Sequence, residues 1–360
     1  MCRVLYRCLT VRGLRRTQMT RTVLHIGPVE SKGGMQATIR HHLRHPPPGW
    51  STESINTHVD GSPIAKINSW RRARKELAHR LRTLPPDVLH VHTATRFSWW
   101  RKRRAVALGL KAGIPVVLQI HAGNFGAFMN SRPTAAKAFI ETCADPQVIP
   151  VALTPRHREL IGIPDMEVIG SPAPPSDLVD PNQRNRNKLL MLARPSPVKG
   201  HPIAMAAISR LRRAGHEVEL HLSGVEADHP EVRRYGGTEN GIFARGWVSD
   251  DEKENLLRTS GMLLMPSTYE GMPVAAMEAL SCGLPVLASP ACEGILGEGG
   301  RIVEDLSVES WAGAIADLIA DEEAWQALCV AGPEAVVEQT PEALGRRWAD
   351  LYDRVIGGGQ

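Results

Sequence analysis

From Arg21 to about Val303 the chain alternates short apolar segments with longer segments of helical character. Alternation of this kind is typical of βαβ units, in which helices connect parallel strands and cover the sheet that the strands form. The sequence therefore predicts an α/β protein built on parallel sheets.

The predicted strands fall into two sets. Those of the first set are residues 22–29, 53–59, 87–94, 115–122 and 148–154, and those of the second are residues 188–194, 217–224, 241–248, 261–267, 284–289 and 300–305. Between the sets, residues 169–187 are rich in Pro, Asp and Asn, a composition typical of exposed linkers. We therefore expect two doubly wound domains, at 19–175 and 186–338, with a boundary near 172–186 and a cleft between them.

The composition is that of a soluble globular protein. Its 360 residues are enough for two ordinary domains, with a hydrophobic fraction of 42% and a charged fraction of 22%. The longest apolar run, residues 104–120, is interrupted by Lys111, Gly113 and Pro115, so no segment reaches the roughly 20 residues that span a bilayer. Six dispersed cysteines without metal or disulfide spacing favour a reducing, cytoplasmic compartment.

Positive charge is concentrated in the first half of the chain. Residues 1–180 contain 26 Lys and Arg against 12 Asp and Glu, and the runs 70–82 and 99–104 carry much of this excess. A basic domain of this kind is expected to face a polyanion. Trp99 and Trp100 lie beside four basic residues; they belong either to a surface that contacts an anionic membrane or to a solvated helix with a buried tryptophan.

Residues 1–18 contain five arginines and no acid. They lack the apolar core and the small-residue cleavage site of a secretory signal. We interpret them as a flexible basic tail or as the product of an upstream start, and expect the fold to begin after them.

The segment 265–289 carries the most specific pattern of the chain. A buried strand leads into a tight EGMP loop, a helix and the next strand, with Glu270 before the loop and Glu278 on the helix. Eight positions are a little over two helical turns, and the loop falls at the carboxyl edge of a parallel sheet, where open α/β proteins bind ligands. We therefore expect both carboxylates to point into one crevice.

Two basic residues open the second set of strands. Arg194 ends a strand, and Lys199 follows it just before a helix. A planar guanidinium and a mobile ammonium at such a position suit phosphate oxygens. In the EGMP loop, Gly271 permits close approach and Pro273 suits the first helical turn, so the backbone N–H groups there form a second expected anion site.

The segments ARPSPVKG and EGMPVAAMEALSCG resemble the donor site of family 4 glycosyltransferases, retaining enzymes of the GT-B fold. The resemblance implies that Glu270 contacts the donor sugar, that Glu278 hydrogen-bonds the ribose, and that Arg194 and Lys199 bind the diphosphate. It also implies two Rossmann-like domains and a final helix, within residues 339–360, that crosses back to the first domain.

The same resemblance assigns further donor-binding positions. Gly33 and Gly34 would face the phosphates across the cleft, and Gly246 and Val248 would lie near the base. The loop itself contributes Gly271, Met272, Pro273 and Val274. Ala193 replaces a common Gly, and GSPAPPSD stands where relatives often have Pro-Asn-Gly-Val.

Several polar residues have two interpretations. His121, at the end of a predicted strand, is either a donor-site residue of catalytic importance, as the resemblance implies, or a structural histidine. His90 and His92 share one strand face, but the sequence identifies no third metal ligand, so we expect a structural pair and no catalytic metal. Asp250 and Asp251 are expected to cap the following helix.

The sequence thus predicts a retaining hexosyl-type glycosyltransferase that moves a sugar from a nucleotide-diphosphate sugar to a hydroxyl of a glycan or lipid-linked acceptor. Such an enzyme serves bacterial-type cell-surface glycan, glycolipid or polysaccharide synthesis, without a cofactor or nucleic-acid partner. It is expected in the cytoplasm, where the basic first domain contacts the inner face of the plasma membrane. The alternatives are a catalytically silent nucleotide-sugar-binding protein and a sugar-nucleotide epimerase on the same fold.

Overall fold

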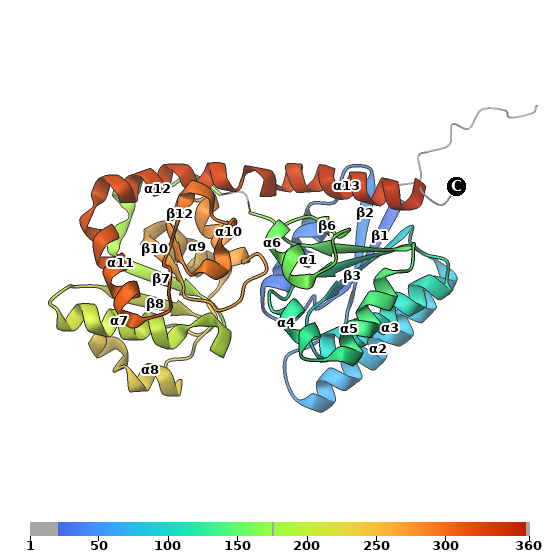
Figure 1. Cartoon of the computed structure of the whole chain (residues 1–360), viewed down its shortest axis with the longest axis horizontal. Coiled ribbons are helices and arrows are strands. Elements are labelled where there is room, and N and C mark those ends of the chain that lie inside the picture. The colour runs from blue at the N-terminus through green and yellow to red at the C-terminus, as the bar shows by residue number, and fades with distance from the viewer. Residues whose placement is uncertain (1–20, 175, 358–360) are drawn as a thin grey trace, which may run out of the picture.

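The computed structural model describes residues 21–174 and 176–357, and the predicted basic tail at 1–18 lies outside them. Two α/β domains stand beside each other, and the last helix runs along both (Figure 1). The first domain comprises β1 (Arg21–Gly27), α1 (Gly34–Arg44), β2 (Trp50–Asn56), α2 (Pro63–Thr83), β3 (Val88–Thr93), α3 (Phe97–Lys111), β4 (Val116–Ile120), α4 (Phe125–Asn130), α5 (Pro133–Cys143), β5 (Val148–Ala152), α6 (Pro155–Ile161) and β6 (Glu167–Val168).

The second domain follows with the same alternation. It comprises β7 (Asn185–Leu192), α7 (His201–Arg213), β8 (Glu219–Ser223), α8 (Pro230–Arg234), β9 (Ile242–Ala244), α9 (Asp250–Thr259), β10 (Ser260–Met265), α10 (Val274–Ser281), β11 (Val286–Ala288), β12 (Gly300–Ile302), α11 (Val308–Ala320) and α12 (Glu322–Ala335). The last helix, α13, spans Pro341–Gly357.

Both sheets are parallel throughout and doubly wound. The first has the strand order β2-β1-β3-β4-β5-β6, and the second has the order β12-β11-β10-β7-β8-β9. In the second sheet the strand order reverses at β7 and β10, which are hydrogen-bonded parallel neighbours. The loops after these two strands therefore meet at a topological switch point, the usual ligand site of such sheets. The predicted fold class, two doubly wound Rossmann-like domains, is confirmed.

The core explains why the strands are so apolar. Every residue of β3 and of β10 is buried, because helices cover both faces of a parallel sheet. On one face of the first sheet, side chains of α2, α3 and α5 form a cluster that includes Leu77, Trp99 and Phe139. Trp99 is fully buried there, which agrees with the interpretation of a buried tryptophan, whereas Trp100 is 36% exposed.

Helix α13 covers the opposite face of the first sheet. Its predicted apolar face is confirmed: Trp348, Leu351 and Tyr352 are buried against strand residues such as Val23 and Val117. A helix that starts beside the second domain and packs on the first joins the two domains by its own length (Figure 1).

The connection between the domains differs from the exposed linker that its composition predicted. Residues 169–173 are buried, and the Ser171 hydroxyl donates a hydrogen bond to the Met272 carbonyl at 3.2 Å. Residues 176–178 are exposed. The prolines keep this segment free of helix and strand, but its first part is held by contacts with the second domain rather than by its own composition.

The cap of α9 is Ser249, whose hydroxyl accepts the Glu252 amide, so Asp250 and Asp251 occupy the first turn instead of the cap position. Within the described residues, no helix combines the length and the apolar character that a membrane crossing requires. The four described cysteines are all free thiols.

Candidate donor site between the domains

Glu270 and Lys199 form an ion pair at the switch point of the second sheet. Lys199 Nζ lies 2.6 Å from Glu270 Oε1, and the Glu270 side chain is only 6% exposed. Lys199 ends a short 3₁₀ turn before α7, while Glu270 follows β10. The sequence predicts separate roles for these two residues and does not reveal their direct contact, which depends on β7 and β10 being neighbours.

Gly200 shows why a glycine follows this lysine. Its φ is +70°, and a Cβ there would lie 2.0 Å from the Pro266 carbonyl oxygen. Only glycine combines this conformation with so close an approach. The backbone thus sets Lys199 against the β10 loop.

Glu278 has a different lysine partner. Lys253 Nζ, on α9, lies 2.6 Å from Glu278 Oε1, and the Glu278 side chain is 13% exposed. Helix α10 begins at Val274, so Glu278 is helical while Glu270 is in the preceding loop. The helical-turn argument for their spacing is therefore wrong, and each carboxylate is held by its own cation. Sequence reasoning missed Lys253, because nothing in its local pattern indicates which acid it contacts.

Arg194 reaches the first domain. A Cβ built on Gly33 would lie 3.2 Å from the Arg194 Nη2 atom. Gly33 also has φ +135°, a conformation that would be strained for any residue with a side chain. Gly33 immediately precedes α1, and Gly34 faces the Val274 side chain at the start of α10. The predicted glycine pair and the predicted arginine thus meet across the domain boundary.

The loop from Glu270 to Pro273 is pressed against the first domain. A Cβ on Gly123 would lie 2.2 Å from the Glu270 carbonyl carbon, and a Cβ on Gly271 would lie 2.9 Å from the His121 carbonyl oxygen. The Met272 sulfur accepts the Ser171 amide at 3.1 Å, and Pro273 precedes the first residue of α10. Glycine is needed at both contacts because the two backbones touch; Gly123 was not identified from the sequence.

Gly246 and Val248 follow β9, the edge strand of the second sheet. Gly246 has φ +63° and forms an isolated antiparallel bridge with Val225, whereas the Val248 side chain is buried in the core. Between them Trp247 is 44% exposed, and the Lys32 ammonium lies 5.3 Å from its ring centroid. The exposed group at this position is therefore the tryptophan, which the sequence did not single out.

His121 is the outer end of a chain of buried histidines. His92 Nδ1 lies 2.9 Å from His121 Nε2, and His92 Nε2 lies 2.9 Å from His25 Nδ1. Burial lowers the pKa of His25 to about 3 and that of His121 to about 3, so the rings are neutral near pH 7. The predicted shared face of His90 and His92 is confirmed, because their rings stack at 4.2 Å.

The hydrogen bonds between these histidines fix the tautomer of His121. His25 Nε2 is buried without a hydrogen-bond partner among the described residues. An unpaired N–H is rarer in protein interiors than an unpaired acceptor, so we assign the His25 proton to Nδ1. His25 then donates to His92 Nε2, His92 donates from Nδ1 to His121 Nε2, and the remaining proton of His121 is on Nδ1. His121 thus presents an N–H donor at that atom.

His25 also supplies the third nitrogen that the sequence could not identify. One ligand atom from each of His25, His90 and His92 lies within 4.8 Å of the others, a set that could hold a borderline metal ion. The same set has no carboxylate, and ring nitrogens of His25 and His92 already bond each other. Metal binding would therefore have to break the histidine chain. The parallel register of β1 and β3, which pairs His25 with His90, created this cluster.

The second domain is similar to known proteins in sequence. Residues 186–321 match the family model of glycosyl transferases group 1. Over 145 residues the chain is 30% identical to an MMP alpha-(1->4)-mannosyltransferase of Mycolicibacterium hassiacum. The aligned part covers 38% of this chain and 35% of that protein. A GDP-mannose-dependent alpha-(1-6)-phosphatidylinositol monomannoside mannosyltransferase of Mycolicibacterium smegmatis is 28% identical over 183 residues, 46% of this chain and 48% of its own.

The matches thus span a third to a half of these curated relatives. Among solved structures, a sucrose-phosphate synthase of Thermosynechococcus elongatus is similar with a TM-score of 0.72 at 14% identity, over 94% of this chain and all of that one. At this identity the likeness concerns the fold, which is GT-B. Residues 186–321 are therefore similar to the glycosyl transferases group 1 family, within a chain that has the GT-B fold.

Proposed function

We propose that this chain is a retaining glycosyltransferase of family 4, which transfers a hexosyl group from a nucleotide-diphosphate sugar to a hydroxyl acceptor. The observations that carry the proposal are the ion pair between Lys199 and Glu270 and the approach of Arg194 to Gly33 of the first domain. Two cations and a nearly buried carboxylate at a switch point suit a diphosphate linked to a polyhydroxylated ring.

In the proposed reaction the acceptor oxygen forms a bond to the anomeric carbon while the bond from that carbon to the diphosphate oxygen breaks. The acceptor attacks from the face that the diphosphate leaves, and a diphosphate oxygen takes the proton of the acceptor hydroxyl. Arg194 and Lys199 stabilise the negative charge that develops on the leaving group. With the diphosphate on Lys199, the Glu270 carboxylate accepts hydrogen bonds from sugar hydroxyls.

The remaining donor contacts follow from the same assignment. Glu278 accepts a hydrogen bond from the ribose, and His121 donates its Nδ1 hydrogen to the sugar. The amides at the start of α10 add dipoles that favour an anion. Gly246 and its neighbours lie beside the base. These roles need no metal ion, so we propose metal-independent transfer and expect EDTA to leave it unchanged.

The test begins with the donor. Thermal shift of the purified chain with UDP-, GDP- and ADP-sugars identifies the nucleotide sugar, starting with GDP-mannose because two relatives are mannosyltransferases. Hydrolysis of the same donors, followed by nucleotide release, measures catalysis without an acceptor. A donor that binds without being hydrolysed or transferred would indicate the silent binding protein, and a change of sugar configuration without transfer would indicate the epimerase. The relatives favour neither alternative.

Two substitutions test the ion pair. We expect Lys199→Ala and Glu270→Ala each to lower transfer at least about 100-fold, as removal of a transition-state contact does elsewhere. Glu309→Ala, which breaks a surface pair with Arg210 in the same domain, is the matched control and should keep full activity. Full activity in both site variants, with the fold intact, would refute the assignment.

We also propose that the first domain contacts the inner face of an anionic plasma membrane. On one side of α2, Ile64 and Ile67 are 70% and 53% exposed, and the exposed Arg71, Arg74 and Lys75 continue the same helical face. Apolar residues beside a row of cations suit the headgroup region of anionic lipid.

Liposome flotation at moderate salt tests this contact. The chain should float with vesicles that contain anionic lipid, and replacing Arg71, Arg74 and Lys75 by Gln should abolish flotation. The control replaces three exposed arginines of the second domain, Arg210, Arg213 and Arg234, by Gln, and should still float. Equal flotation of both variants would remove the membrane contact.

A further inference from the structure

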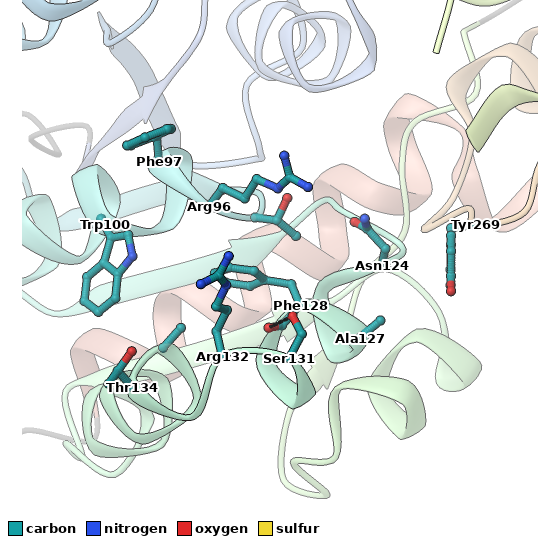
Figure 2. A pocket seen from close by; sticks show the side chains of 12 residues that line it. Arg96, Phe97, Trp100, Asn124, Ala127, Phe128, Ser131, Arg132, Thr134 and Tyr269 are labelled. Atoms are coloured by element: carbon teal, nitrogen blue, oxygen red, sulfur yellow. Dashed lines mark hydrogen bonds between the residues drawn. The ribbon is translucent and has the colours of Figure 1, made fainter. Parts of the chain in front are cut away.

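A cavity of about 670 Å³ opens beside the proposed donor site (Figure 2). The first domain supplies most of its wall, from the starts of α3 and α5 and from α4, and the second domain contributes Tyr269. A cavity of this size is large enough for a sugar with a further substituent.

The wall of the cavity is positively charged. It contains Arg96 and Arg132 and no Asp or Glu. Neither arginine forms an ion pair with a residue of the described parts of the chain. Figure 2 shows both side chains on the cavity wall. Two guanidinium groups without a carboxylate partner favour an anionic ligand, which they bind in a planar, bidentate manner.

The backbone holds Arg96 in an unusual conformation. Its φ is +56°, and within the described residues it is the one non-glycine with positive φ. The turn is fixed on both sides: the Ala94 amide donates to the Ser98 hydroxyl at 3.2 Å, and the Trp100 amide donates to the Arg96 carbonyl. Such a conformation costs on the order of 1–3 kcal/mol and persists only where the surroundings impose it. The direction of the side chain is therefore set by the fold.

Aromatic side chains form the apolar part of the wall. Phe97 is 82% exposed, Trp100 is 36% exposed and Tyr269 is 46% exposed, and Phe128 also lines the cavity. Exposed aromatic rings that cluster in a cavity mark a binding site more often than a bare surface. Their faces suit the C–H side of a sugar ring or a short alkyl chain.

The cavity lies next to the position proposed for the donor sugar. Tyr269 directly precedes Glu270, and Asn124 directly follows Gly123, the residue packed against the Glu270 carbonyl. A molecule in the cavity can therefore approach the sugar held by Glu270 and His121.

We propose that this cavity is the acceptor site and that its ligand is a glycoside bearing an anionic group, a phosphate or a carboxylate. The two arginines bind the anion and the aromatic residues bind the sugar. The proposal rests on the proposed function for the identity of the donor side, but anion binding in the cavity is measured without a donor.

Calorimetric titration of the full chain compares three probes below their micelle concentrations. These are octyl glucoside, octyl glucuronide and octyl glucoside 6-phosphate, which differ in the presence and the type of the anion. We expect at least one anionic probe to bind about 10-fold or more tightly than the neutral probe, the worth of a charge-assisted hydrogen bond. The glucuronide and the phosphate separate the two sources of the anion.

Variants assign the effect to the cavity. Arg132→Gln should weaken the preferred anionic probe about 10-fold and leave the neutral probe within two-fold, and the double variant with Arg96→Gly should abolish the preference. Glycine at 96 tolerates the positive φ, so the backbone is retained. Arg104→Gln on α3, outside the cavity, is the control and should behave as wild type. Phe97→Ala should weaken all probes.

Each outcome decides the proposal. Equal binding of neutral and anionic probes, or a preference that survives the double variant, would overturn it. If no nucleotide sugar is bound or hydrolysed, the proposed function fails, whereas an Arg132-dependent preference still establishes the anion site. With an active donor, transfer to the anionic probe completes the assignment as acceptor site if the KM for that probe increases in Arg132→Gln and stays at the wild-type value in Arg104→Gln.

Discussion

His42 shows how burial of single residues shapes the behaviour of the first domain. Burial lowers its pKa well below 6.5, and its ring stacks on that of His25 at 5.0 Å. His25, His90 and His92 have lowered pKa values for the same reason. The folded chain therefore keeps these side chains neutral under conditions in which the unfolded chain protonates them.

The free energy of unfolding should consequently fall as pH is lowered. The folded pKa values lie below the unfolded value, so the stability is complete above about pH 6.5 and is lost progressively below it, as the unfolded state binds the extra protons. Each such histidine contributes a slope of up to about 1.4 kcal/mol per pH unit. Urea unfolding at pH 5, 6, 7 and 8 measures this slope.

His42→Phe should reduce the slope of the unfolding free energy against pH by the equivalent of about one bound proton. The change removes one titrating ring and keeps an aromatic ring in the stack. His216→Phe is the control, because His216 is an exposed residue at the end of α7. An unchanged slope in His42→Phe would mean that this histidine does not stay neutral in the fold.

The histidine chain makes a second prediction at the same scale. If His92 fixes the tautomer of His121, long-range ¹H–¹⁵N correlation spectra should show the His121 proton on Nδ1. His92→Leu should produce a mixture of tautomers and lower kcat with little change in KM for the donor, whereas His92→Asn, which can still donate from its amide, should restore part of kcat. A single His121 tautomer that is the same in wild type and His92→Leu would contradict the assignment.

At the scale of elements, backbone contact between the β10 loop and the β4 loop positions Glu270, whose carboxylate we propose to bind the donor sugar. Gly123→Ala would place a Cβ 2.2 Å from the Glu270 carbonyl carbon, so the loop must move. Displacement of a positioned group by about 1 Å can lower catalysis on the order of 100-fold. We therefore expect Gly123→Ala to lose about 100-fold in kcat/KM while its thermal unfolding changes little.

Gly313→Ala provides the control for this substitution. Gly313 lies within α11, and nothing lies within 4 Å of a Cβ built there. The change should keep activity and stabilise the fold by about 1 kcal/mol, because alanine is the better helix former. Wild-type activity in Gly123→Ala would show that the loop position does not govern catalysis.

At the scale of the whole molecule, α13 unites the two domains (Figure 1). Trp348 and Tyr352 are fully buried against the first sheet, and the Tyr352 hydroxyl lies 2.7 Å from His90 Nδ1. Trp348→Ala should lower the free energy of unfolding by about 3–5 kcal/mol, as large-to-small core changes do.

The effect of Trp348→Ala should fall first on the first domain. Hydrogen exchange of β1 and β3 amides should accelerate more than that of β7 and β10 amides, since Trp348 packs against side chains of the first domain. Trp325→Ala, in the core of the second domain, is expected to show the reverse pattern. Equal acceleration in both domains would mean that they unfold as one unit.

Much of the architecture was predictable because periodicity and strand apolarity are local. Eleven predicted strands correspond to strands of the two sheets, whereas β6 has two residues and leaves no pattern to detect. The burial of residues 169–173 was not predictable, since it depends on Met272, about a hundred residues away.

The sequence by itself determined the fold class, the amphipathic last helix and the residue types of the donor motif, because these depend on local spacing and on side-chain chemistry. Only the tertiary structure decided which charges meet. It paired Lys199 with Glu270 and Lys253 with Glu278, brought His25 beside His90, and set Arg96 with Arg132 around one cavity. The physical reason is that strand order and register place residues side by side that the chain keeps far apart.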